Sequence, residues 1–186
     1  MHLTRNEKVG VRALIVALGE KMVTFEWAGL PETTVDHNGR PQLGKIVILS
    51  KDRALEFEYD KPWACISITD NLHFAAELNH GLSKQNRVDL LSLTFHDIWE
   101  ARHAQYGTEE WIMMKEEQAD QVVSFVKAVW DKIDLLMVHC YAGISRSSAI
   151  GKILSEHYSD GFSNFYHKLY QPNPHVYNLV KESLKK

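Results

Sequence analysis

The chain has 186 residues, of which 45% are hydrophobic and 24% are charged, and its formal net charge is −3. These values predict one globular domain with room for a short extension. The net charge excludes a global basic field, so we expect no nucleic-acid partner. Separately, we expect a monomer.

Two further features of the composition concern location. No apolar run approaches the roughly 20 residues that a membrane span needs, and the first eight residues lack the apolar core of a signal peptide. The only cysteines are Cys65 and Cys140, too few for a disulfide framework. We therefore expect no membrane span and a reducing, cytoplasmic location.

The first part of the chain has β character. Two β-like runs within residues 9–27 are broken at Gly19-Glu20, which indicates a hairpin, and Asn38-Gly39 is a turn signal further on. We assign residues 1–44 to an N-terminal extension, a β-hairpin packed on the domain, and residues 45–186 to the main domain.

Strands and helices alternate from residue 45 onward. Short apolar runs predict strands at 45–50, 63–69, 87–95 and 134–139. Residues 98–115 give no clear signal and could be partly helical.

Helix signals separate these runs. Ser50 can cap a brief helix, Asp70 or Asn71 can cap a second that ends at Gly81, and Asn173-Pro174 can open the last one. The expected helices are 51–58, 70–81, 116–132, 147–158, 162–170 and 174–184. This order predicts an α/β fold with a mostly parallel central sheet flanked by helices on both faces, with ligands beyond the carboxyl ends of the strands.

The stretch VHCYAGISRSSA, residues 138–149, joins the last strand to a helix. Its loop N–H groups can point at one anion, and the helix N-terminus adds about half a positive charge. Gly143 permits a backbone conformation that a Cβ would resist, and Arg146 can fold its planar guanidinium over a bound oxyanion. This pattern predicts an anion cradle with Cys140 at its base.

The positive electrostatic potential of the loop amides, the helix N-terminus and Arg146 also acts on Cys140. A free thiol has a pKa of about 8.5, and helix N-termini with nearby cations lower such values to roughly 3.5–7.5. We therefore expect Cys140 to be a thiolate that can attack phosphorus, with the Ser147 hydroxyl as its hydrogen-bond donor. No G-K-[ST] follows the glycine, so this is not a nucleotide-binding loop. The chain also lacks paired zinc-ligand spacing, and we expect neither metal nor cofactor.

His139-Cys140-(five residues)-Arg146-Ser147 resembles the H-C-x5-R-[ST] motif of the cysteine-dependent protein tyrosine phosphatases, most of all their compact dual-specificity branch with bacterial and phage-type members. The resemblance spans roughly residues 45–183 and implies a phosphatase-like fold, with residues 45–186 as the catalytic domain. It also implies that loop residues bind the phosphoryl oxygens: Tyr141, Ala142, Gly143, Ile144, Ser145 and Arg146.

The family supplies a general acid from an upstream loop that follows a strand. The matching residue here is Asp97 in LTFHDIWE, and Asp70 and Glu100 stay open as alternatives. The gap between Asp97 and Cys140 is longer than in compact relatives, and residues 98–115 account for the excess. Trp99, Arg102 and His103 either shape the pocket mouth or are ordinary packing and surface residues.

Two further residues have structural interpretations. His139 is expected to hold the loop rather than transfer protons. Cys65 is either a buried core cysteine or, as in some relatives, a partner that protects an oxidised nucleophile.

The sequence thus predicts hydrolysis of phosphotyrosine, and with it phosphoserine or phosphothreonine, through a cysteinyl-phosphate intermediate. The loop carries no lysine that would favour phosphoinositides. An inositol-phosphate or other small phosphoester remains open as a substrate. A non-catalytic phosphate-binding module, and sulfur transfer or arsenate reduction, remain open as other functions.

Overall fold

A four-stranded parallel sheet forms the centre of the molecule. The computed structural model describes residues 16–18, 21–23, 45–99, 112–158 and 170–186. The strands lie in the order β3 (Ile46–Ser50), β6 (Leu135–Cys140), β4 (Trp63–Thr69) and β5 (Arg87–Thr94). All three strand pairs are parallel, because a helix or loop returns the chain to the same end of the sheet each time.

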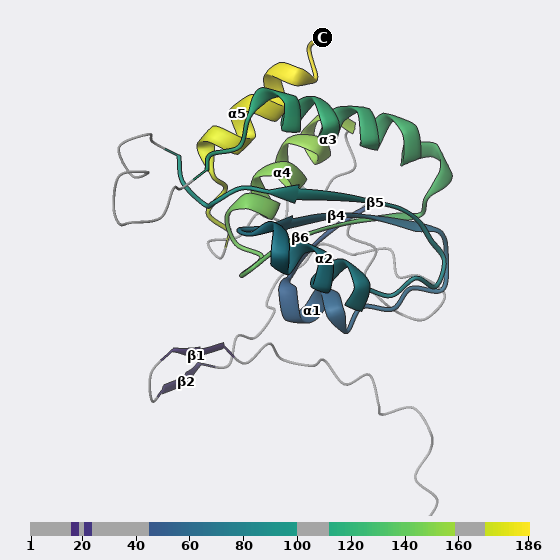
Figure 1. The fold of residues 1–186 in the computed structure, drawn as a ribbon, viewed down its shortest axis with the longest axis vertical. Helices are drawn as coiled ribbons and strands as arrows, with labels where there is room; N and C mark the ends of the chain where they lie inside the picture. Colours follow the sequence, from purple (N-terminus) through teal and green to yellow (C-terminus); the bar gives the residue numbers. More distant parts are fainter. Residues whose placement is uncertain (1–15, 19–20, 24–44, 100–111, 159–169) are drawn as a thin grey trace, which may run out of the picture.

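Helices cover both faces of this sheet (Figure 1). On one face lie α1 (Lys51–Leu55) and α2 (Leu72–Gly81). The other face carries α3 (Glu116–Val129), α4 (Arg146–Tyr158) and α5 (Pro174–Ser183), and a 3₁₀ turn, η2 (Trp130–Lys132), follows α3. The predicted α/β class is therefore confirmed.

The side chains of the two central strands alternate between two cores. In β4, Ala64, Ile66 and Ile68 join the larger core under α3, α4 and α5, whereas Trp63 and Cys65 join the smaller one with α1. All seven β4 residues are buried, as expected for a parallel strand covered on both faces.

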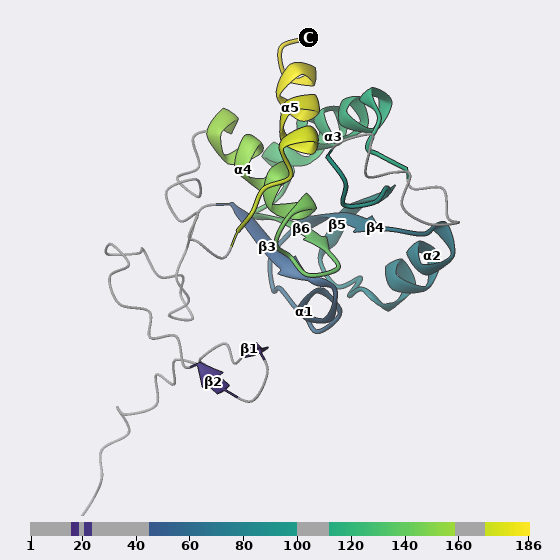
Figure 2. The same ribbon diagram turned by 90° about the vertical axis from the view of Figure 1, so that its left-hand side faces the viewer.

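The connections place a crevice at the carboxyl ends of β6 and β4. Figure 2 shows the same layers from the side: β6 leads into α4 on one face, while the neighbouring strand β4 leads into α2 on the other. Ligands of parallel α/β sheets bind where adjacent strands diverge in this way. Register aligns the strand ends, with Ser50 beside Cys140 and Thr69 beside Thr94.

The sequence located most elements. Strand β4, the cap of α2 by Asn71 and the opening of α5 at Asn173-Pro174 are as predicted. Several boundaries differ by one to three residues: for example, β6 continues through Cys140 because Cys140 pairs with Ser50, α1 already ends at Leu55, and α3 ends at Val129, where η2 follows.

Other expectations concern the ends of the chain and its loops. Strands β1 (Val16–Leu18) and β2 (Lys21–Val23) pair antiparallel, as a hairpin broken at residues 19–20 requires. The rest of residues 1–44, most of 98–115 and nearly all of the helix expected at 162–170 lie outside the described residues. Among the described helices, none is long and apolar enough to cross a membrane.

Candidate active site

The loop between β6 and α4 is shaped by one glycine. Gly143 has a φ of +73°, in the left-handed region that side chains resist. A Cβ at this position would lie 2.8 Å from the carbonyl carbon of Leu49 and 2.8 Å from the nitrogen of Ser50. The loop therefore packs its backbone directly against the end of β3, which only glycine permits.

Three carbonyl groups of the loop accept hydrogen bonds from residues outside it. Tyr141 O accepts a hydrogen bond from Lys51 N at 3.1 Å, Ile144 O from Gln171 N at 3.0 Å, and Ser145 O from Asn173 N at 3.2 Å. In a trans peptide, the N–H of the next residue points opposite to the carbonyl, and the described residues contain no cis bond. The amides of residues 142, 145 and 146 therefore point toward the inside of the loop.

Cys140 ends β6, directly before this loop, and lines the same cavity as the loop residues. Its Sγ atom is 3.1 Å from the Oγ atom of Ser147, which sits in the first turn of α4. Both residues are buried, at 2% and 0% exposed. A hydroxyl this close can donate to the sulfur when the thiol has lost its proton.

Arg146 begins α4, and its buried side chain is anchored at one end only. Its Nη1 atom donates to the carbonyl of Phe95 at 2.8 Å and forms an ion pair with Asp70 Oδ1. Its Nε atom is buried and has no hydrogen-bond partner among the described residues. Because a buried charged donor without a partner is costly, Nε is a group that an anionic acceptor would stabilise.

Asp97 follows β5, and its side chain contacts the loop between β6 and α4. Its Oδ1 atom accepts from Ser145 Oγ at 2.7 Å and from Asn173 Nδ2 at 2.9 Å. Within the described part of the chain, Oδ2 has no hydrogen-bond partner. The carboxylate is thus fixed through one oxygen while the other is free.

These groups line a cavity of about 640 Å³. Cys140, Arg146, Ser145 and Asp97 contribute its polar part. The rest of its lining is mostly apolar and comes from three segments: Trp99, Tyr141, Ala142, Ile144, Gln171, Pro172, Asn173 and Pro174. The cavity therefore suits a ligand with an anionic end and an apolar body.

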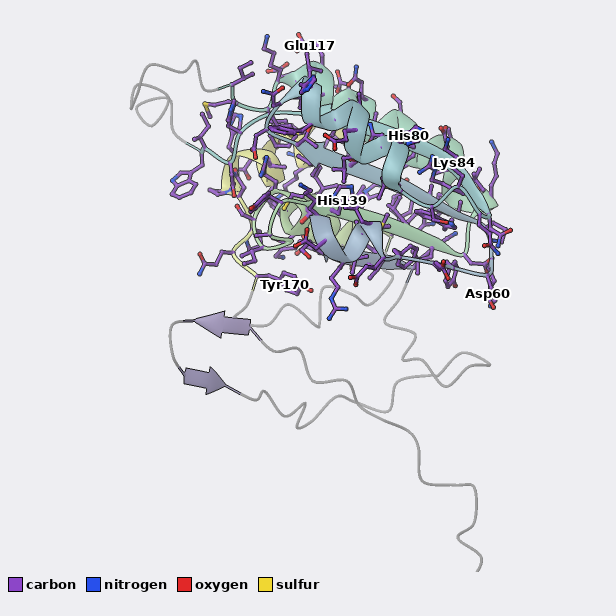
Figure 3. The ribbon with its side chains drawn as sticks, turned by 60° about the horizontal axis from the view of Figure 1, so that its bottom comes forward. Asp60, His80, Lys84, Glu117, His139 and Tyr170 are labelled. Carbon is purple, nitrogen blue, oxygen red and sulfur yellow. The ribbon has the colours of Figure 1, made fainter. Side chains whose placement is uncertain are left out.

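His139 lies beneath the loop, and Figure 3 shows it inside the layered body, whereas Asp60 lies at the edge. It is fully buried, and neither ring nitrogen has a hydrogen-bond partner in the described part of the chain. Burial lowers its pKa to about 4, against a smaller opposing effect of the Cys140 backbone. The ring is therefore neutral at physiological pH, which fits the expected structural role.

Cys65 is buried on the opposite side of the sheet from Cys140. It pairs with Met137 and belongs to the smaller core, whereas Cys140 belongs to the larger one, three positions further along β6. Burial raises the pKa of the Cys65 thiol, so this residue is a poor nucleophile. Both cysteines are free, and the offset exceeds the roughly 7 Å that a disulfide can bridge.

The structure brings together most of the residues that the sequence singled out. Cys140, Arg146, Ser147 and Asp97 meet at one end of the sheet, and Trp99 lines the cavity. Asp70, weighed as an alternative acid, instead contacts Arg146. Glu100, Arg102 and His103 lie outside the described residues.

Some contributors were not foreseen. The sequence marked Asn173 only as a helix cap, and gave no signal for Gln171, Pro172 or the Phe95 carbonyl. The N-cap pattern was the one available hint. It places Asn173 at the start of a helix but does not indicate which residues its side-chain amide contacts.

Comparisons with known proteins bear on the fold. No family model matches the chain, and no curated protein matches it. Similar solved structures include human DUSP28, with a TM-score of 0.47, 10% identity, and 76% of this chain and 92% of that chain covered. Human tyrosine phosphatase-like serine/threonine/tyrosine-interacting protein gives a TM-score of 0.49 at 14% identity, covering 76% of this chain and 91% of that chain.

A third similar structure is the PTP-2 phosphatase of Cydia pomonella, with a TM-score of 0.46, 15% identity, and 81% of this chain and 88% of that chain covered. At these identities and TM-scores, the case for a function rests on the chemistry of the site.

Proposed function

We propose that the chain is a cysteine phosphatase that hydrolyses phosphate monoesters through a cysteinyl-phosphate intermediate, with residues 45–186 as its catalytic domain. The observation that carries the proposal is the Nε atom of Arg146, buried without a hydrogen-bond partner among the described residues, on a residue that lines the same cavity as Cys140 and belongs to the loop of inward-pointing amides. A phosphoryl group supplies several acceptor oxygens in one place and would satisfy these donors together.

In the first step, the Cys140 thiolate attacks phosphorus. A P–S bond forms, the bond from phosphorus to the ester oxygen breaks, and Asp97 gives its proton to the departing oxygen. Arg146 and the loop amides bind the three other phosphoryl oxygens throughout, so they stabilise the charge that develops in the transition state.

In the second step, water attacks phosphorus from the side that the leaving group vacated. The Asp97 carboxylate takes a proton from this water, the P–S bond breaks and inorganic phosphate leaves. Ser147 Oγ, at 3.1 Å from Sγ, donates a hydrogen bond to the sulfur as it regains its negative charge. One carboxyl group thus serves as acid and then as base.

The substrate proposed here is phosphotyrosine in a protein, with phosphoserine and phosphothreonine as further candidates. An apolar wall that includes Trp99 and Pro172 suits the flat body of a phenyl ring. The loop residues Tyr141, Ala142 and Ile144 add no cationic side chain for further phosphate groups. A small phosphoester or an inositol phosphate is the alternative within the same chemistry.

Turnover of para-nitrophenyl phosphate by the full chain tests the proposal. Cys140→Ser should lower turnover by about 10⁴-fold or more, because an alcohol is a far weaker nucleophile than a thiolate. Cys65→Ala, which alters the other cysteine, should keep wild-type turnover. Vanadate should inhibit competitively, and EDTA should have no effect.

Two results would overturn the proposal. Turnover that survives in Cys140→Ser would show that another group attacks phosphorus. A wild-type chain that binds phosphate but turns over no phosphoester would identify a phosphate-binding module instead. Side-by-side assay of phosphotyrosine, phosphoserine and phosphothreonine peptides with inositol phosphates would then define the substrate range.

A further inference from the structure

Asn173 is a buried residue that contacts three parts of the site at once. It is 1% exposed, and its Oδ1 atom caps α5 by accepting from His175 N at 3.0 Å and Val176 N at 3.1 Å. Its Nδ2 atom donates to Asp97 Oδ1 at 2.9 Å and to the carbonyl of Ile98 at 3.3 Å. A helix cap needs only the Oδ1 contacts, so the Nδ2 contacts require another explanation.

The segment that carries Asn173 is also tied to the phosphate-binding loop. Asn173 N donates to Ser145 O at 3.2 Å, and Gln171 N donates to Ile144 O at 3.0 Å. Residues 171–173 therefore connect the loop of Cys140 to the loop of Asp97. Because Asp97 lies on no helix or strand, its position relative to Cys140 depends on such contacts, of which the direct Ser145–Asp97 hydrogen bond is another.

The donors that hold Asp97 are both uncharged. When Oδ2 carries the proton, Oδ1 is still a carbonyl-type acceptor, so Ser145 and Asn173 can keep their hydrogen bonds in both protonation states. A cationic partner would instead favour one charge state of the carboxyl group. The arrangement thus fixes direction without opposing either proton transfer.

We propose that Asn173 is a positioning residue for the acid–base steps: its amide holds Asp97 Oδ1 so that Oδ2 faces the leaving oxygen and, later, the water. This inference rests on the proposed function, since it needs a leaving group. It assigns to the cap of α5 a second role that a helix start does not require.

The test compares two leaving groups. Phenolate is a poor leaving group that depends on proton donation, whereas para-nitrophenolate leaves with little help. Asn173→Ser keeps a good N-cap but is too short to reach Asp97. We expect kcat for phenyl phosphate to fall about 10-fold or more, within the 10²–10⁴ that a general acid contributes. For para-nitrophenyl phosphate, kcat should fall by only a small factor, and KM should stay close to the wild-type value for both.

Asn71→Ser is the matched control, since Asn71 also caps a helix with its side chain, through His73 N at 2.7 Å, but touches no part of Asp97. It should leave both rates unchanged. Asn173→Asp is a second variant that retains the cap and removes the amide donor, so the phenyl phosphate rate should fall here too. Thermal unfolding of all three variants checks that the fold is kept.

A double-mutant cycle completes the experiment. In an Asp97→Asn background, Asn173→Ser should cause no further loss, because there is no longer an acid to position. Equal losses for both leaving groups, or a full further loss in that background, would overturn the inference and reduce Asn173 to a helix cap.

Failure of the proposed function would look different. In that case the wild-type chain would show no turnover that depends on Cys140, whatever residue stands at 173. The hydrogen bond is then tested by the ¹³C resonance of the Asp97 carboxyl carbon. It should move in Asn173→Ser and stay in Asn71→Ser, and an unmoved resonance in Asn173→Ser would overturn the inference.

Discussion

The segments that follow β4 and β5 present an aspartate at the same edge of the sheet, yet to different partners. Asp70, after β4, pairs with the guanidinium of Arg146. Asp97, after β5, accepts from the uncharged donors Ser145 and Asn173. Both residues are candidates for the general acid by their position in the fold. Their hydrogen-bond partners indicate which of the two can transfer a proton.

The difference has a chemical meaning. An oxygen that neutralises a guanidinium fixes the direction of that guanidinium and is occupied by it. An oxygen pair with one atom fixed and one free can deliver a proton to a neighbouring ligand. We therefore assign the proton transfers of the proposed reaction to Asp97, and the orientation of Arg146 to Asp70.

Among changes to the two aspartates and their partners, the largest expected effect comes from removing the acid. Asp97→Ala should lower kcat for phenyl phosphate by about 10²–10⁴-fold, with KM little changed, because binding is carried by the loop and Arg146. Steady-state assays with both leaving groups measure this. If Asp70→Ala rather than Asp97→Ala shows the dependence on the leaving group, the two assignments must be exchanged.

The rates of Asp97→Ala and Asp70→Ala depend on pH through the reaction and also through the stability of the fold, to which His139 contributes. His139 has a pKa of about 4 when folded and an ordinary value of 6.5. The unfolded state therefore binds a proton first, and the stability that neutral His139 contributes above pH 6.5 is lost as the pH falls toward 4.

The expected loss is about 2 kcal/mol in the free energy of unfolding between pH 7 and pH 5. Urea unfolding at both pH values measures it. His139→Gln should lose this part of the pH dependence, while His80→Gln, on an exposed side chain, should keep it. If the wild-type protein is equally stable at both pH values, burial of neutral His139 does not control its stability. Rates measured below pH 6.5 would then report on the reaction alone.

A smaller effect is expected for the partner of the guanidinium. Asp70→Ala removes one of the two anchors of Arg146 Nη1 and leaves the Phe95 carbonyl. We expect kcat/KM to fall about 10-fold, roughly the contribution of one hydrogen bond to a charged group. The fall should be equal for phenyl and para-nitrophenyl phosphate, because the guanidinium binds the phosphoryl group common to both. A fall confined to phenyl phosphate would make Asp70 part of the proton transfer.

The smallest effect should come from Ser145→Ala. This change removes one of the two donors to Asp97 Oδ1 and leaves Asn173 in place. A loss of about threefold for phenyl phosphate is expected, on the order of a single neutral hydrogen bond. Wild-type rates in this variant would mean that Asn173 alone positions the acid.

The features that could be predicted from the sequence are those determined by residues close to one another in the chain. The loop from Cys140 to Ser147 could be interpreted in advance because its glycine, its small residues and its helix start act on one another within a few positions. Asp97 was chosen because the resemblance implies an acid in a loop that follows a strand, and Asp97 comes directly after the strand expected at 87–95.

The partners of the two aspartates were beyond that kind of reasoning. The Arg146–Asp70 and Asn173–Asp97 contacts each join residues 76 positions apart, and they depend on side-chain direction rather than on strand order. The Phe95 carbonyl that anchors Arg146 is a backbone group, which any residue type would supply. Sequence patterns carry no record of such contacts.

Gly143 has a consequence for how this scaffold could be altered. The backbone of Gly143 packs directly against the backbone at the end of β3. The position of the loop amides is therefore determined by contacts between main-chain atoms. The side chains on either side are free of that constraint: Tyr141 is 71% exposed and Ile144 is 43% exposed. In the proposed reaction, the main chain of this segment binds the anion and the side chains at 141 and 144 face the rest of the ligand, so we expect changes at these two positions to alter selectivity and to leave the chemistry intact.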